Sequence, residues 1–225
     1  MQVNRSENKY LITQVQAACI KKRLQNVIPL DVHCTSMQGY EIRSLYFDTV
    51  KNRSCYEKLE GYRIHEKIRL RIYGHDDHII KLESKWKDGM RQVKKSLLIS
   101  RSLANELILG KYEGLKDFDD PLSMYFYKRL SEGMVPKAII TYDRLSYCLN
   151  TNNTRITFDS NIRSTESNFN LFLERLETHP ILPASHVILE VKFNGFLLDY
   201  IKRELEGLKQ SVTSYSKYVN GRMFY

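Results

Sequence analysis

The sequence predicts an α+β fold, an eight-stranded antiparallel β-barrel with helices packed on its outside. Stretches that alternate apolar and ionisable residues outnumber stretches with helical periodicity. Short polar turns separate several of them, which favours hairpins over βαβ crossovers. Closing such a sheet into a barrel would also remove its unpaired edges. We interpret the 225 residues as a single domain, residues 1–225.

The first half of the chain is rich in strand patterns. Strands are expected at 6–12, 41–48, 66–73, 78–86 and 91–99, and the last three are expected to form a meander. A capping box of Thr13 and Gln16 predicts a helix that continues to about Asn26. A short helical connection is expected at 49–59. The Asp88-Gly89 pair is a turn signal before the strand at 91–99.

The second half mixes helices and strands. Helices are expected at 102–109, 121–132 and 196–209, and strands at 137–147, 154–160 and 186–193. Gly110 and Gly133 end the first two helices, and Pro121 begins the second. Residues 161–182 show little periodicity and are predicted to be mostly loop. Residues 211–225 are polar and aromatic without a clear period.

Composition points to an anionic partner. Hydrophobic residues make up 42% of the chain, enough for a real core, and the formal net charge is +9. That charge favours nucleic acid, an anionic membrane or a phosphorylated molecule, although a basic surface kept for solubility is an alternative. Four cysteines lack metal or redox spacing and are interpreted as reduced thiols. With a polar N-terminus and no apolar run of spanning length, we expect a cytoplasmic protein without a membrane span.

Ionisable residues fall on one face of the expected strands. In 66–73, Ile68 and Leu70 lie opposite Arg69 and Arg71, and the pattern recurs elsewhere. The ionisable faces carry Lys9, Arg69, Arg71, Lys85, Arg144, Arg155, Glu7, Glu83, Asp159 and Glu190. Two like charges about 10 Å apart repel by roughly 1.5 kcal/mol at an effective dielectric near 20, so the excess of cations predicts a bound anion. Arginine suits phosphate oxygens, and the carboxylates suit a hard divalent cation.

Simpler readings of these residues stay open. Arg69 and Arg71 are compatible with a solvated strand face, and Glu190 with an ordinary pair to a lysine. No glycine-rich phosphate loop is present, so a nucleotide would not be held that way. The 15 tyrosines keep nucleic-acid binding in view. We do not expect it, because the basic residues alternate with apolar ones and mix with acids.

Seven short segments occur in the order seen in the vacuolar transporter chaperone (VTC) polyphosphate polymerase domain, which this chain resembles. That domain belongs to the triphosphate tunnel metalloenzyme superfamily, which includes the CYTH phosphohydrolases. The resemblance spans nearly the whole chain. The segments are Glu7-Asn8-Lys9-Tyr10, Arg69-Leu70-Arg71, Glu83-Ser84-Lys85, Tyr142-Asp143-Arg144, Arg155-Ile156-Thr157-Phe158-Asp159, Leu189-Glu190-Val191-Lys192 and Ser216-Lys217-Tyr218.

The resemblance implies an eight-stranded tunnel, open at both ends, that transfers the terminal phosphoryl group of ATP to polyphosphate. By resemblance, the phosphate-contacting catalytic residues would be Lys9, Arg69, Arg71, Lys85, Arg144 and Arg155. The substrate-binding residues would be Lys94 or its neighbour Lys95, Ser216 and Lys217. Glu190 and Glu7 would bind Mn²⁺ or Mg²⁺. The implied partners are ATP and polyphosphate, and the sequence does not indicate an oligomeric state.

One departure from the superfamily pattern bears on the reaction. Many CYTH members begin with Glu-x-Glu-x-Lys, whereas Arg5 takes the first of those positions here and leaves only Glu7. One carboxylate fewer favours the polymerase over the hydrolase. Two alternatives remain: a triphosphatase acting on inorganic or nucleoside triphosphate, and a non-catalytic module that binds polyphosphate or nucleotide.

Overall fold

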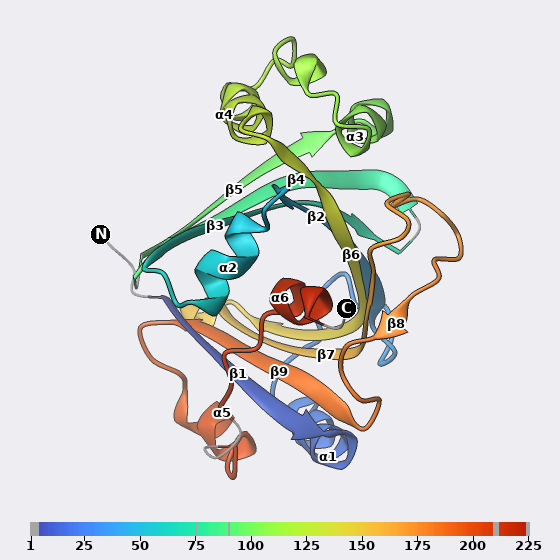
Figure 1. The fold of residues 1–225 in the computed structure, drawn as a ribbon. Helices are drawn as coiled ribbons and strands as arrows, with labels where there is room; N and C mark the ends of the chain where they lie inside the picture. Colours follow the sequence, from blue (N-terminus) through green and yellow to red (C-terminus); the bar gives the residue numbers. More distant parts are fainter. Residues whose placement is uncertain (1–4, 75, 90, 209–211, 224–225) are drawn as a thin grey trace. The chain divides into compact units, whose positions relative to one another are not determined.

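The computed structural model describes residues 5–74, 76–89, 91–208 and 212–223. Its chain folds into two compact units, each assembled from three separate segments (Figure 1). Unit 1 contains Met1–Glu41, Tyr142–Ile162 and Pro180–Ser216. Unit 2 contains Ile42–Thr141, Arg163–His179 and Lys217–Tyr225. Hydrogen bonds link the described strands in the order β1-β9-β7-β6-β2-β3-β4-β5, with β8 paired to β7.

Unit 1 is built on β1 and β9, whose strands pair antiparallel, and on β7, which pairs antiparallel with the other side of β9. Its elements are β1 (Arg5–Thr13), α1 (Gln14–Leu24), η2 (Thr151–Asn153), β9 (His186–Asn194) and α5 (Asp199–Glu204). Four of the described strands contribute residues to both units: β2 (Tyr40–Thr49), β6 (Met134–Leu149), β7 (Thr154–Thr165) and β8 (His179–Pro180).

Helix α1 begins at the predicted capping box. The backbone N of Gln16 donates to Thr13 Oγ1 at 3.2 Å, and the backbone N of Thr13 donates to Gln16 Oε1 at 2.8 Å. The helix then buries Ala17, Ile20 and Leu24. These side chains pack in one apolar cluster with alternate residues of β7 and β9, so the opposite face of those strands is left to polar side chains.

Unit 2 contains a four-stranded meander in which β2, β3, β4 and β5 pair antiparallel in sequence order. The strands are β2 (Tyr40–Thr49), β3 (Ile64–Tyr73), β4 (Asp76–Asp88) and β5 (Arg91–Ile99). The other elements are α2 (Arg53–Leu59), α3 (Arg101–Ile108), η1 (Glu113–Leu115), α4 (Pro121–Ser131), β8 (His179–Pro180) and α6 (Lys217–Arg222).

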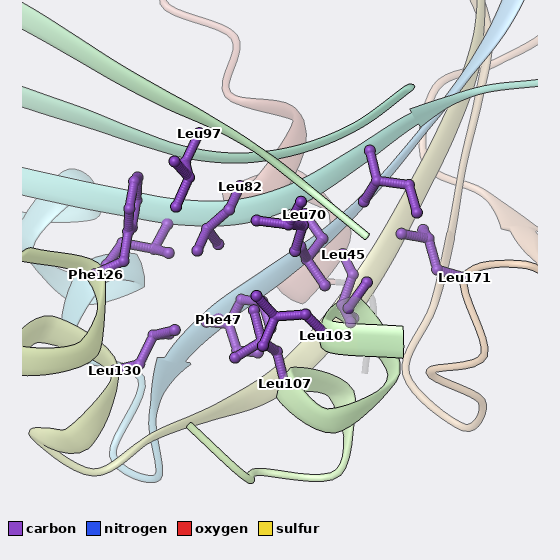
Figure 2. Close-up of a cluster of buried hydrophobic side chains, with 14 of the residues drawn as sticks. Leu45, Phe47, Leu70, Leu82, Leu97, Leu103, Leu107, Phe126, Leu130 and Leu171 are labelled. Atoms are coloured by element: carbon purple, nitrogen blue, oxygen red, sulfur yellow. The ribbon is translucent and has the colours of Figure 1, made fainter. Parts of the chain in front are cut away.

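One face of the meander forms the core of unit 2. Figure 2 shows Leu70 and Leu82 of the sheet packed toward Leu107 of α3. Alternate residues of β3 and β4 point away from this core, so the second face of these two strands carries Lys67, Arg69, Arg71, Glu83 and Lys85. The same cluster includes Leu45, Phe47, Leu97, Leu103, Phe126, Leu130 and Leu171.

The α+β class, the antiparallel pairing and the placement of helices against the apolar strand faces are confirmed. The prediction that residues 161–182 are mostly loop is confirmed, except that β7 continues to Thr165 and His179–Pro180 forms β8. Asn161 sits in β7 with a φ of +49°, which interrupts the alternation and hides the strand from pattern analysis.

The C-terminal helices also differ from the prediction. The expected helix at 196–209 is limited to α5, and residue 209 lies outside the described part of the chain. The segment without a clear period contains α6, which at six residues is too short to display a helical repeat. In the described part of the chain, no helix combines the length and apolar character needed to cross a membrane.

Candidate functional site

Three cations gather around Glu83 in unit 2, a carboxylate whose side chain is 2% exposed. Arg69 donates to Glu83 Oε2 through Nε at 2.9 Å and Nη2 at 2.7 Å. Arg71 Nη1 lies 3.8 Å from the same oxygen, and Lys94 Nζ contacts Oε1. Burial raises the pKa of Glu83, but Arg69, Arg71 and Lys94 outweigh it and lower the pKa to about 2. Glu83 is therefore ionised at neutral pH, in contact with three cations.

A row of lysines crosses the same face of the meander. Lys85 on β4 lies directly opposite Lys67 on β3 and directly opposite Lys94 on β5. Directly opposed residues have Cβ atoms about 4.5–5.5 Å apart, and like charges at that spacing are destabilising. Lys95 instead places Nζ 3.2 Å from the centre of the Tyr125 ring of α4, on the helix side. Of the two neighbouring lysines, Lys94 is thus the one beside Glu83.

Helix α6 is joined to this group through Tyr46. The hydroxyl of Tyr46 accepts a hydrogen bond from Arg69 Nη1 at 3.0 Å. Its ring stacks on the Tyr218 ring, with centroids 4.8 Å apart and planes 20° from parallel. Lys217, the first residue of α6, is therefore held next to the Arg69 group, as the residue before Tyr218. Ser216, which ends the last segment of unit 1, is partly buried.

A buried carboxylate anchors α6. The Tyr218 hydroxyl donates to Asp48 Oδ2 at 2.7 Å, and Asp48 is fully buried. Asp48 also accepts from the backbone N of Ser54 at 2.8 Å and of Cys55 at 3.0 Å, at the start of α2. Burial and the neighbouring Asp48 charge raise the pKa of Tyr218, so its hydroxyl stays protonated as the donor. Asp48 thus connects the beginnings of two helices.

In unit 1, two carboxylates and two lysines alternate across β1 and β9. Glu7 is paired in register with Lys192, and Lys9 with Glu190. Lys9 Nζ lies 3.5 Å from Glu7 Oε1 and 3.9 Å from Glu190 Oε1. Lys192 Nζ lies 3.7 Å from Glu7 Oε2 and 3.1 Å from Glu190 Oε1. Each carboxylate therefore contacts both ammonium groups.

Arg144 continues this group on β6. Its Nε and Nη2 each donate to a different oxygen of Asp159 at 2.7 Å, which is a two-point pair with a fully buried carboxylate. Arg144 Nη2 also lies 3.9 Å from Glu190 Oε2. Arg144 therefore contacts two carboxylates, whereas Glu83 contacts three cations.

Arg155 contacts one loop residue, Asp31, and one residue of β6, Ser146. Its Nη2 lies 3.1 Å from Asp31 Oδ2, and its Nε donates to Ser146 Oγ at 3.0 Å. The Cys148 thiol also donates to Asp31 Oδ2, at 3.0 Å. Burial together with this hydrogen bond raises the pKa of Cys148 to about 11, so the thiol stays protonated at neutral pH.

The structure divides the predicted site residues between the two units. Glu7, Lys9, Arg144, Arg155 and Glu190 gather in unit 1, whereas Arg69, Arg71, Lys85 and Lys94 gather in unit 2. Four residues of these groups were not among the predicted site residues. They are Lys67, Lys192, Tyr46 and Asp31. The alternation that identified Arg69 also contains Lys67, and the one that identified Glu190 contains Lys192. Asp31 lies after α1 in a segment without periodicity, and no sequence signal could have found it.

Glu7 and Glu190 are the two carboxylates that were predicted to bind a divalent cation. Among the described residues, no group of three or more His, Cys, Asp or Glu side chains could hold a metal ion. Two carboxylates nevertheless suit Mg²⁺ or a similar hard ion, which commonly takes its remaining ligands from substrate phosphates and water. The donor set therefore fits an ion that binds together with phosphate.

Comparison with known proteins gives a family and a fold. The model of the VTC domain family matches residues 4–224. Among solved structures, a candidate adenylate cyclase from Bacillus halodurans superimposes with a TM-score of 0.54 at 12% identity, covering 99% of this chain and 100% of that one. A candidate adenylyl cyclase from Hippeastrum with a dominant triphosphatase activity gives a TM-score of 0.58 at 11% identity, covering 99% and 95%.

A third similar structure is a candidate adenylate cyclase from Vibrio parahaemolyticus, with a TM-score of 0.55 at 11% identity and 98% of both chains covered. At these identities the similarity shows the fold alone. No curated protein sequence matches the chain at a significant level.

Proposed function

The chain belongs to the VTC domain family, and from that membership we propose that it binds chains of linked phosphates and transfers the terminal phosphoryl group of ATP to polyphosphate. The contacts around Glu83 carry the proposal. Three cations contact this carboxylate, and three directly opposed lysines lie beside it. A chain with a negative charge on each phosphate would relieve their mutual repulsion.

The guanidinium groups are arranged for two-point recognition. Arg69 grips Glu83, and Arg144 grips Asp159, each through two nitrogens. Arg144 donates to both oxygens of Asp159, whereas both bonds from Arg69 go to Glu83 Oε2. A phosphate group offers several oxygens to such a fork. Phosphoryl transfer depends on positioning and on neutralising charge over the phosphate oxygens, and it needs no covalent nucleophile from the protein. We assign the positioning to these arginines and the neutralisation to Arg71, Lys67, Lys85 and Lys94.

Glu7 and Glu190 would hold Mn²⁺ or Mg²⁺, whose charge would offset that of the phosphate oxygens. In the structure both carboxylates contact Lys9 and Lys192. Phosphate would draw these two ammonium groups to its own oxygens, because a polyphosphate carries more charge than a carboxylate. The carboxylates would then be available to the ion at the moment when phosphate is present.

A triphosphatase is the second candidate. The Hippeastrum protein of similar fold has a dominant triphosphatase activity. In that reaction water would accept the phosphoryl group in place of polyphosphate, and the same cations would neutralise the charge. A binding module without turnover is the third candidate, and it would need the cations of unit 2 alone.

One product assay separates the three. The purified chain is incubated with ATP and Mn²⁺, long phosphate chains are resolved on a gel, and released inorganic phosphate is measured. Long chains support the polymerase, and phosphate release without chains supports the triphosphatase. If the chain binds tripolyphosphate but forms neither product, the result supports the non-catalytic binding module. If neither ATP nor tripolyphosphate binds, the whole proposal is wrong.

Two variants test the assignments within the site. Glu190→Gln should abolish turnover and keep much of the binding of tripolyphosphate in EDTA, because Glu190 is assigned to the ion and its contacts with Lys9, Lys192 and Arg144 would be given up to phosphate in any case. Lys9→Met should weaken that binding about 10- to 100-fold, since a hydrogen bond to a charged group contributes about 1.5–3 kcal/mol. Lys22→Met removes an exposed lysine of α1 and serves as the matched control. Equal affinities of the two lysine variants would contradict the role of Lys9.

A further inference from the structure

The hydroxyl of Thr157 is a buried polar group that finds no hydrogen-bond partner among the described residues. Thr157 is 3% exposed and lies on β7 between Arg155 and Asp159, on the same strand face. A buried hydroxyl without a partner destabilises a folded chain, and valine would fill the same space without that cost. The Thr157 hydroxyl therefore has a cost in stability that a functional role would offset.

The residue paired with Thr157 on the neighbouring strand is Glu190, which is assigned to the divalent ion. Thr157 is paired in register with Glu190 of β9, so their Cβ atoms face each other on one side of the sheet. The χ1 angle of a β-branched side chain is restricted, which fixes the direction of the hydroxyl. A hydroxyl so placed is within reach of the Glu190 carboxylate, which is itself almost fully buried.

The Glu190 carboxylate contacts three cations, which explains why the Thr157 hydroxyl has no hydrogen-bond partner in the described part of the chain. The carboxylate lies 3.1 Å from Lys192, 3.9 Å from Lys9 and 3.9 Å from Arg144. All three are cations that a bound phosphate chain would attract. When they turn to phosphate oxygens and the divalent ion binds Glu190, a neutral donor that phosphate does not displace would keep the carboxylate oriented.

We propose that Thr157 is a positioning residue, whose hydroxyl donates a hydrogen bond to the Glu190 carboxylate once phosphate and the divalent ion are both bound. The inference rests on the proposed function, which assigns the three cations to phosphate and Glu190 to the divalent ion. Binding would exchange the partners of Glu190: cations contact it in the free chain, and the Thr157 hydroxyl contacts it in the loaded chain. The exchange keeps the carboxylate oriented toward the ion.

The test compares Thr157→Val, which keeps the shape and removes the hydroxyl, with Thr157→Ser, which keeps the hydroxyl. Calorimetry measures the affinity for tripolyphosphate once in EDTA and once with saturating Mn²⁺. For Thr157→Val we expect wild-type affinity in EDTA and about a 10-fold loss with Mn²⁺. Its thermal midpoint without ligand should be unchanged or higher, because an unsatisfied group is removed. Thr157→Ser should match the wild type in both buffers.

Several results would overturn the proposal. Wild-type affinity of Thr157→Val with Mn²⁺ would show that the hydroxyl is not used. An equal loss in EDTA would show that it contacts phosphate instead of Glu190. In a Glu190→Gln background, Thr157→Val should cause no further loss, and an additive loss would contradict the coupling. A wild-type chain that binds tripolyphosphate in neither buffer would instead refute the proposed function.

Discussion

Replacing Glu83 by glutamine tests the electrostatics of unit 2 most directly. The change removes one negative charge and keeps the side-chain shape, which leaves Arg69, Arg71 and Lys94 without their shared counter-charge. Because the pKa of Glu83 falls from 4.5 to about 2 in the folded chain, and each pKa unit corresponds to about 1.4 kcal/mol, its ionised form stabilises the fold by about 3 kcal/mol at neutral pH.

The pH dependence follows from the direction of this pKa. A carboxyl group whose pKa is lower in the folded chain contributes its full stabilisation above pH 4.5 and loses it as the pH falls toward 2. At pH 3 the same relation leaves about 1 kcal/mol. Glu83→Gln should therefore cost about 3 kcal/mol of unfolding free energy at pH 7 and about 1 kcal/mol at pH 3.

Urea denaturation at the two pH values measures both numbers. Glu60→Gln, an exposed position at the end of α2, serves as the control and should change the unfolding free energy little at either pH. Equal losses for Glu83→Gln at pH 7 and pH 3 would mean that packing, not charge, explains the destabilisation. An unchanged free energy at pH 7 would refute the assignment of Glu83 as the shared counter-charge.

Two further substitutions test the local geometry, both by urea denaturation. Gly39→Ala should cost about 1–3 kcal/mol more than Gly61→Ala, because the two glycines have φ of +77° and +71° but only the first would place a Cβ 2.1 Å from the Arg144 carbonyl oxygen. Similar losses for the two would argue against the close approach. Tyr218→Phe should cost about 1–3 kcal/mol, because buried Asp48 loses a donor while the ring remains. A wild-type unfolding free energy for that variant would show that Asp48 does not depend on the hydroxyl.

The strand alternation predicted which residues share a face, but not which residues meet across strands. A period of two places Arg69 and Arg71 together whatever the neighbouring strand does, so this part of the prediction needs one segment only. The alignment of Lys67, Lys85 and Lys94 depends on the pairing register of three strands. A single strand carries no information about that register, which is set by the turns and the core.

Residues outside the strands were beyond the reach of periodicity. Asp31 contacts Arg155 from a loop, and α6 brings Tyr218 to Asp48 from a segment that shows no repeat. Periodicity also did not show which charges meet. Glu83 contacts three cations, whereas Arg144 contacts both Asp159 and Glu190. These contacts depend on distances between side chains in the folded chain, which the sequence alone does not give.

The bond between Asp48 and Tyr218 joins residues 170 positions apart in the chain. The β2–β5 meander needs only consecutive hairpin pairings, so it can form before that distant segment arrives. Closing so long a loop costs entropy that only the completed contact repays. We therefore expect α6 to be the last part of unit 2 to dock during refolding and the first to detach during unfolding. Substitutions at Tyr218 should accordingly accelerate unfolding and leave the folding rate nearly unchanged.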